Sequence, residues 1–175
     1  MASNGHWLTE LIRDIDDYPT PGVTFRDITP LLGDASGFGR AITELARRFD
    51  DMPVDRVLGM EARGFIIAAP VAYRMGAGFV PVRKAGKLPW AVVREEYSLE
   101  YGHDKLEIHR DAIHPGERIL VIDDVLATGG TAAATVRLVE TLGGVVVGIG
   151  VLIELEELGG RARLEGHLVE SLARY

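Results

Sequence analysis

Residues 119–131 of the chain, ILVIDDVLATGGT, join a short apolar run to two adjacent aspartates and then to a glycine pair. A short apolar run is typical of a strand buried on both faces, which favours a parallel sheet covered by helices. Ligands of such sheets bind at the carboxyl ends of the strands, where Asp123 and Asp124 stand. Side chains alternate along a strand, so we expect one carboxylate to face a ligand and the other to reach sideways to a second hydroxyl, cation or basic side chain.

The turn after the aspartates, Ala127–Thr131, has the chemistry of an anion-binding loop. Gly129 and Gly130 allow close backbone approach, and the N–H groups of the helix that begins here point at the anion. Thr128 and Thr131 add hydroxyl donors. The turn has no lysine, so it does not match the nucleoside-triphosphate loop GxxxxGK[ST], and it also lacks GxGxxG. A loop without lysine suits one terminal phosphate better than a triphosphate. The alternative is a plain helix cap beside a surface pair of acids.

Apolar runs that flank amphipathic helices occur twice along the chain, which predicts two βαβ units. Two such units predict an α/β fold with a mostly parallel central sheet flanked by helices. The length of 175 residues suits a single domain over 1–175. The predicted units are strands 54–60 and 78–82 around a helix at 64–75, and strands 118–122 and 145–153 around a helix at 131–142.

The N-terminal part of the chain is less regular. Four apolar residues on one face predict a short helix at 8–15, and three prolines and a glycine indicate an irregular segment at 18–30. Asp34 or Ser36 is suited to cap a helix whose apolar positions recur over 38–49 with helical spacing.

Residues 84–105 show no convincing periodicity and are interpreted as a long loop. A loop of that length inside a compact domain is usually functional or disordered. Basic side chains at one end and acidic and tyrosine side chains at the other favour a function. A mobile solvated insertion is the alternative.

Composition excludes several classes of function. The net charge of −7, from 19 basic and 26 acidic residues, argues against a nucleic-acid partner. The absence of cysteine excludes disulfides, thiolate nucleophiles and zinc–sulfur sites. No secretory signal and no apolar stretch of about 18 residues is found, so we expect a soluble cytoplasmic protein with no membrane partner. The five histidines match no metal spacing, and we expect no metal site built from side chains.

The complete pattern resembles the type I phosphoribosyltransferases, and among them the enzymes that act on adenine. The resemblance implies their fold, with a small N-terminal hood region at 1–34, a long flexible catalytic loop at 84–105, and a homodimer. The blocks that carry it, besides residues 119–131, are PTPGVTFRDITPLL at 19–32, GMEARGF at 59–65, VRKAGKLP at 82–89, EEYSLEYG at 95–102 and VLIELEELGGR at 151–161.

The reaction implied by this resemblance is transfer of the 5-phosphoribosyl group from phosphoribosyl pyrophosphate to N9 of adenine. The products would be AMP and pyrophosphate, as in purine salvage. Mg²⁺ is the implied cofactor, held mainly by substrate and water rather than by side chains. It would share with basic groups the neutralisation of the leaving pyrophosphate.

The resemblance also implies roles for the residues that bind the sugar and its phosphates. Residues 127–131 would hold the 5-phosphate, and Asp123 and Asp124 would accept hydrogen bonds from the ribose 2- and 3-hydroxyls. The basic side chains of Arg83, Lys84 and Lys87 match the family's pyrophosphate segment. Part of that segment reaches the neighbouring subunit's site in the family dimer, so these groups would act in trans. Three solvated surface cations are the alternative.

A turn at 61–64 would bind pyrophosphate, with a cis peptide implied between Glu61 and Ala62 and a catalytic and ring-edge role implied for Arg63. A surface ion pair is the alternative for Arg63.

Purine recognition is assigned to four further residues. By resemblance, Phe25 stacks on the ring, the backbone at Thr24 within the Thr24–Arg26 segment reads the amino edge, and Leu155 closes the other face. Phe25 as a core plug is the alternative.

The block EEYSLEYG contains the last two candidate site residues. Glu100 matches the acceptor of the purine proton, and Tyr101 would pack over the reacting ribose in a lid that excludes water. Glu100 as one more acid in a mobile lid is the alternative. Trp90 departs from the family pattern, where a smaller residue is expected.

Two other functions stay open. One is a related transferase for another purine base such as hypoxanthine or xanthine, which the PTPG-x-x-FRD block disfavours. The other is a non-enzymatic regulator that senses phosphoribosyl pyrophosphate. Such regulators typically add a DNA-reading domain or a basic surface, and this acidic chain shows neither.

Overall fold

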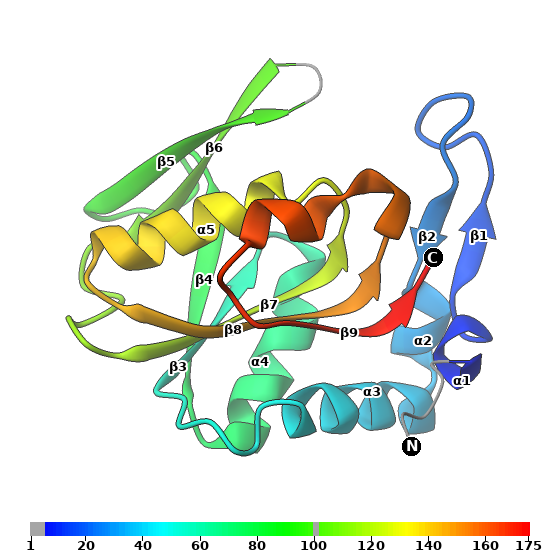
Figure 1. Ribbon diagram of the computed structural model, residues 1–175, viewed down its shortest axis with the longest axis horizontal. Coiled ribbons are helices and arrows are strands. Elements are labelled where there is room, and N and C mark those ends of the chain that lie inside the picture. The colour runs from blue at the N-terminus through cyan, green and yellow to red at the C-terminus, as the bar shows by residue number, and fades with distance from the viewer. Residues whose placement is uncertain (1–5, 100–101) are drawn as a thin grey trace.

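The computed structural model describes residues 6–99 and 102–175 and is built around a seven-stranded sheet (Figure 1). The strand order is β5-β6-β4-β3-β7-β8-β9. The five strands from β4 to β9 in this order pair in parallel, and β5 and β6 join that sheet antiparallel. This confirms the mostly parallel α/β architecture. The strands are β3 Arg56–Met60, β4 Gly78–Lys84, β5 Val92–Leu99, β6 Gly102–His109, β7 Arg118–Leu126, β8 Val145–Glu154 and β9 Val169–Arg174.

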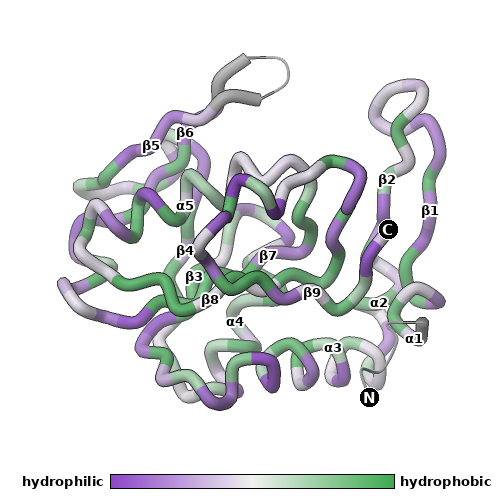
Figure 2. Tube along the Cα trace, viewed as in Figure 1, coloured by the Kyte–Doolittle hydropathy of each residue, from purple (hydrophilic) through white to green (hydrophobic). Residues whose placement is uncertain are grey.

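Helices cover both faces of the sheet, and the middle strands are largely hydrophobic along their length in Figure 2, as expected of strands buried on both sides. Helices α3 (Ala35–Arg47) and α4 (Arg63–Met75) lie on one face, and α5 (Gly130–Thr141) lies on the other (Figure 1). Two clusters of buried side chains result, one on each side of the sheet. Two 3₁₀ turns, η1 (Glu156–Leu158) and η2 (Gly160–Leu164), follow β8.

The predicted βαβ units are confirmed, with one informative difference. Strand β7 continues to Leu126, four residues beyond the predicted end at 122, because β8 runs beside it as far as the Leu126–Glu154 pair. Asp123 and Asp124 therefore lie inside the strand, on opposite faces, rather than after it. Asp34 rather than Ser36 caps α3, since its side chain accepts a hydrogen bond from the Gly37 N–H at 2.6 Å.

The predicted helix at 8–15 is wrong. Helix α1 (His6–Thr9) stops early, and residues Arg13–Ile15 form strand β1, which pairs antiparallel with β2 (Phe25–Asp27) before α2 (Thr29–Gly33). The apolar residues that suggested a helix, Leu8 and Ile12, are buried as expected. Pairing with β2, inside the segment expected to be irregular, outweighs local helical spacing.

The interpretation of residues 84–105 as a loop is also wrong for most of its length. Strands β5 and β6 form a long antiparallel hairpin. Charged cross-strand pairs such as Arg94–Glu107, at 2.6 Å, mask its alternation in the sequence. Tyr97 and Leu106 still point inward and are buried. None of the helices in the described ranges 6–99 and 102–175 is long and apolar enough to cross a bilayer.

Candidate active site

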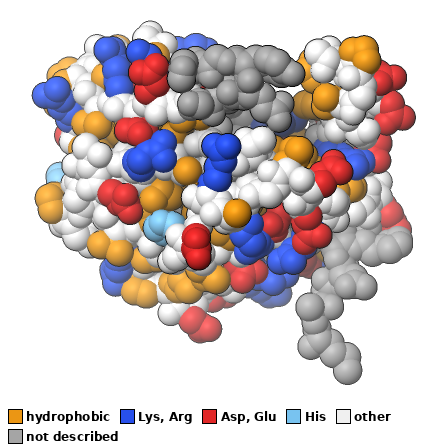
Figure 3. Space-filling model, turned by 45° about the horizontal axis from the view of Figure 1, so that its top comes forward, with side chains coloured by type: hydrophobic (Ala, Val, Ile, Leu, Met, Phe, Trp, Pro, Cys, Tyr) orange, Lys and Arg blue, Asp and Glu red, His pale blue; other side chains and the backbone are white. Residues whose placement is uncertain are grey.

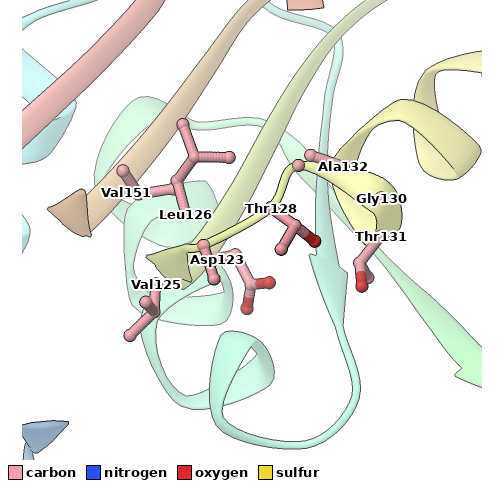
Figure 4. Close-up of a pocket in the computed structure, with 10 residues that line it drawn as sticks. Asp123, Val125, Leu126, Thr128, Gly130, Thr131, Ala132 and Val151 are labelled. Carbon is pink, nitrogen blue, oxygen red and sulfur yellow. The ribbon is translucent and has the colours of Figure 1, made fainter. Parts of the chain in front are cut away.

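The loop between β7 and α5 encloses a small hollow of about 80 Å³. Figure 4 shows the side-chain oxygens of Asp123, Thr128 and Thr131 on the same side of this loop, with Leu126 pointing away. Gly129 has a φ of +79°, a conformation that a residue with a Cβ rarely adopts, and Gly130 begins α5. The hollow therefore combines hydroxyl donors with backbone N–H groups at a helix N-terminus, which suits an anion such as a phosphate group. Its lining residues are Asp123, Val125, Leu126, Ala127, Thr128, Gly129, Gly130, Thr131, Ala132 and Val151.

The two aspartates have different surroundings. Burial and the neighbouring Asp124 carboxylate raise the pKa of Asp123 well above its ordinary value, although the Asp124 N–H donates a hydrogen bond to Asp123 Oδ1 at 2.9 Å. The chain also closes on Asp123 from α4, where a Cβ on Gly64 would lie 2.5 Å from Oδ1. Asp123 is therefore a crowded acceptor that favours a hydroxyl partner over a second negative charge.

Asp124 is paired with the first residue of α4. Arg63 Nε lies 2.7 Å from Asp124 Oδ2, and the Asp124 side chain is only 8% exposed. The same guanidinium lies over the Phe25 ring, 4.9 Å from its centre, and Phe25 packs edge-on against Tyr18. Arg63 thus links the aspartates at the sheet edge to the aromatic pair of the N-terminal segment.

A second charged cluster forms around the turn after β3. The peptide bond between Glu61 and Ala62 is cis, as the family resemblance implies. The Glu61 carboxylate accepts hydrogen bonds from Lys87 Nζ at 2.6 Å, from the Lys84 backbone N–H at 3.1 Å and from Arg83 Nε at 3.3 Å. Burial acts to raise the pKa of Glu61, but these three donors outweigh it and the pKa lies below its ordinary value. Three predicted anion ligands are thereby held within one chain, beside a carboxylate.

The two regions are connected through the hairpin. Thr131 Oγ1 lies 3.5 Å from the Tyr97 hydroxyl, which donates to Asp104 Oδ2 at 3.4 Å. Lys84 Nζ pairs with the same carboxylate oxygen at 3.0 Å. Burial raises the pKa of Tyr97, so its hydroxyl keeps its proton and can donate.

Comparison with known proteins agrees with this geometry. A family model described as "Phosphoribosyl transferase domain" matches residues 32–170. An adenine phosphoribosyltransferase of Symbiobacterium thermophilum is 56% identical over 164 residues, which cover 94% of this chain and 96% of the relative. This chain belongs to the adenine phosphoribosyltransferase family.

Solved structures of adenine phosphoribosyltransferases are equally similar in fold. The one from Thermoanaerobacter pseudethanolicus has a TM-score of 0.96 and 48% identity, covering 98% of this chain and 100% of the other. The one from Saccharomyces cerevisiae, solved with an imino-altritol bisphosphate and adenine, has a TM-score of 0.91 and 36% identity, covering 98% and 99%. The type I fold expected from the sequence is confirmed.

The base-binding residues expected for an adenine phosphoribosyltransferase are only partly brought together. Phe25 reaches the site through Arg63, whereas Arg26 forms an ion pair with Asp14 and lies over the Tyr175 ring, 4.1 Å from its centre. Thr24 donates through its hydroxyl to Asp16 at 3.1 Å, which leaves its main chain for other contacts. Leu155 packs partly buried against the core beside β8.

Glu100 and Tyr101 lie outside the described residues. Sequence reasoning missed Tyr18, Tyr97 and Asp104, although Tyr18 and Tyr97 stand inside or beside blocks that carried the resemblance. Trp90 is exposed and packs edge-on against His109.

Magnesium fits this site only with help from other ligands. Within residues 6–99 and 102–175, no group of three or more His, Asp or Glu side chains is placed to hold a metal ion. Asp124 is engaged with Arg63, which leaves Asp123 as the carboxylate that faces the hollow. A Mg²⁺ ion prefers six oxygen ligands, so most of them would come from phosphate groups and water.

Proposed function

We propose that this protein transfers the 5-phosphoribosyl group from phosphoribosyl pyrophosphate to N9 of adenine and releases AMP and pyrophosphate. The observation that carries the proposal is the Arg63 bridge, which joins the Asp123–Asp124 pair to Phe25. The carboxylates that would accept the ribose diol and the ring that would stack on the base thus lie on either side of one guanidinium, which supports binding of a nucleotide. The yeast relative solved with adenine and a sugar-like bisphosphate supports the same substrate class.

In this proposal each group acts where charge has to be matched. Residues 127–131 bind the 5-phosphate, and Asp123 and Asp124 accept hydrogen bonds from the ribose hydroxyls. Arg83 and Lys87 would leave Glu61, and Lys84 would leave Asp104, to neutralise the departing pyrophosphate. Mg²⁺ supplies further neutralisation of that leaving group when bound.

Adenine is the base we favour. Main-chain groups at Thr24 would pair with the amino edge of adenine, whereas hypoxanthine or xanthine would place a carbonyl against a carbonyl. Phe25 would stack on one ring face and Leu155 would close the other. Arg26, held by Asp14, would support this segment rather than touch the base.

A transferase for another purine and a regulator remain the competing functions. A regulator that reads nucleic acid needs a basic face, and basic and acidic side chains are interspersed on the face drawn in Figure 3. We further propose a cytoplasmic location, since phosphoribosyl pyrophosphate is too highly charged to cross a bilayer.

We also propose that the protein is a homodimer, with the pyrophosphate segment near the partner. Helix α4 and the start of β4 expose Ile66, Tyr73 and Phe79, whose exposed fractions are 45%, 90% and 38%. A second copy would cover this apolar set. Sedimentation of the protein gives its oligomeric state directly.

The deciding experiment is a turnover assay with adenine, phosphoribosyl pyrophosphate and Mg²⁺ that follows AMP. Hypoxanthine, xanthine and guanine are tested in parallel. We expect AMP to form and kcat/KM for adenine to exceed that for the other bases by at least 100-fold. Binding of phosphoribosyl pyrophosphate without turnover of any base would contradict the proposal and favour a regulator.

Thr131→Val is expected to raise KM for phosphoribosyl pyrophosphate by about tenfold or more, because a hydrogen bond to a charged group contributes about 1.5–3 kcal/mol. KM for adenine should change little. Thr141→Val at the other end of α5 is the matched control. Equal effects of the two substitutions would remove Thr131 from phosphate binding.

Glu100→Gln is expected to lower kcat by about 100-fold, because the amide cannot accept the purine proton. Binding of phosphoribosyl pyrophosphate should stay within a factor of about three, since the role assigned to Glu100 concerns the base. Single-turnover rates of AMP formation measure the chemical step. An unchanged rate would leave Glu100 without a catalytic role.

A further inference from the structure

The chain after β8 packs backbone against backbone on the loop that binds the phosphate. A Cβ on Gly160 would lie 2.1 Å from the carbonyl oxygen of Ala127, and one on Gly129 would lie 2.4 Å from the carbonyl oxygen of Gly160. Both distances are far below ordinary contact, so each glycine is required by the other segment. Figure 1 shows this segment (orange) beside the N-terminal end of α5 (yellow), which η2 contacts.

An ion pair between a partly exposed arginine and a buried carboxylate holds this segment in place. Arg161 donates through Nε and Nη2 to the two oxygens of Glu154, at 2.7 and 2.6 Å, and through Nη1 to the Val169 carbonyl at 2.8 Å. The Glu154 side chain is only 5% exposed and accepts a further hydrogen bond from Ser171 Oγ at 2.8 Å. A bidentate arginine–carboxylate pair fixes the plane of the guanidinium group, whereas a single hydrogen bond does not.

The same pair is coupled to the active-site strand. Glu154 is the last residue of β8 and pairs with Leu126, the last residue of β7, immediately before the phosphate loop. The Leu155 N–H donates to the Leu126 carbonyl at 2.9 Å. The segment therefore leaves the sheet beside the loop, carries Leu155, and returns over the loop at Gly160.

We propose that Arg161 is a positioning residue for phosphate binding: through its pair with Glu154 it holds the Gly160 backbone against Ala127 and Gly129 and so sets the shape of the hollow. In this role Arg161 acts through Glu154 and does not itself contact the substrate. The inference rests on the proposed binding of the 5-phosphate at residues 127–131.

The first test is Gly160→Ala. Its methyl group would force the Ala127 carbonyl outward by more than 1 Å, given ordinary contacts of at least 3.4 Å. We expect KM for phosphoribosyl pyrophosphate to rise at least tenfold. Gly39→Ala on α3, where a Cβ meets nothing within 4 Å, is the matched control and should leave KM unchanged.

The second test uses Arg161 and does not depend on whether Gly160→Ala folds. Arg161→Met removes the pair and is expected to raise KM for phosphoribosyl pyrophosphate, and Kd for ribose 5-phosphate, at least tenfold, with kcat within threefold. Arg161→Lys keeps the positive charge but not the bidentate geometry, so its affinity for ribose 5-phosphate should lie between those of wild type and Arg161→Met. Arg163→Met on the same 3₁₀ turn is the control, because Arg163 is exposed.

The outcomes separate this inference from the proposed function. If Thr131→Val weakens binding of ribose 5-phosphate while folded Arg161→Met does not, the phosphate site stands and the positioning role is wrong. If neither variant weakens it, the phosphate does not bind at residues 127–131 and both proposals are wrong. A fall in kcat and thermal stability with unchanged KM would assign the pair to stability alone and overturn the inference.

Discussion

Replacing Asp123 by asparagine is expected to lower kcat/KM for phosphoribosyl pyrophosphate by about 100-fold while raising the melting temperature. The activity falls because the carboxylate that we propose as the acceptor of a ribose hydroxyl becomes a neutral amide, and a hydrogen bond to a charged group contributes about 1.5–3 kcal/mol. The fold gains because burial and the Asp124 carboxylate already raise the pKa of Asp123, so its charge is costly in the folded state.

The raised pKa of Asp123 also predicts how the stability difference between the two proteins changes with pH. A carboxyl group whose pKa is raised on folding contributes stability that is fully present below its unfolded pKa and is lost as the pH rises through its folded pKa. The wild-type protein and Asp123→Asn should therefore melt at similar temperatures in acid and diverge as the pH rises, with the variant more stable. The melting temperatures of the two proteins are measured over a range of about four pH units, from about pH 4 to about pH 8. A variant that is less stable than wild type at the upper end would contradict the burial argument.

Arg63→Met is expected to lower kcat/KM for both substrates by about 100-fold. The substitution removes the partner of Asp124, 2.7 Å away, and the cation that lies over Phe25. Asp124 is then left buried without its counter-charge, which should also cost about 1–2 kcal/mol of folding free energy. That cost is smaller than for a fully buried pair because the Arg63 side chain is 35% exposed.

Two further variants make the Arg63 result interpretable. Arg74→Met removes an exposed arginine from the last turn of the same helix and should leave both activity and stability unchanged. Arg63→Lys keeps a positive charge near Asp124 and should recover stability, but only part of the activity, because an ammonium group does not stack on a ring as a guanidinium does. Full recovery of activity by lysine would show that the contact with Phe25 is unimportant.

The sequence was informative where local and tertiary forces agree. The buried strands and the glycine loop were predictable because a strand covered on both faces must be apolar, and because a phosphate loop needs glycines at close approaches. The hairpin of β5 and β6 was not predictable. One of its faces carries charges such as Arg94 and Glu107, which satisfy each other across the strands and hide the alternation.

The site shows the same division. Asp123, Asp124 and residues 127–131 could be named from their order along the chain, because a strand end followed by a helix N-terminus is a local feature. The contacts around them could not be predicted, because they join segments that are 26 to 61 residues apart in sequence. These contacts are the ion pair of Asp124 with Arg63, the ion pair of Glu61 with Lys87 and the packing of Gly160 on Ala127.

By itself, the sequence determined the two βαβ units of this chain and which residues meet at the carboxyl edge of the sheet, because those depend on apolar periodicity and on the special geometry of glycine. Only the tertiary structure decided which charge each of those residues faces. Ion pairs between distant segments have no periodic signature, since a single partner within about 4 Å is enough to form one.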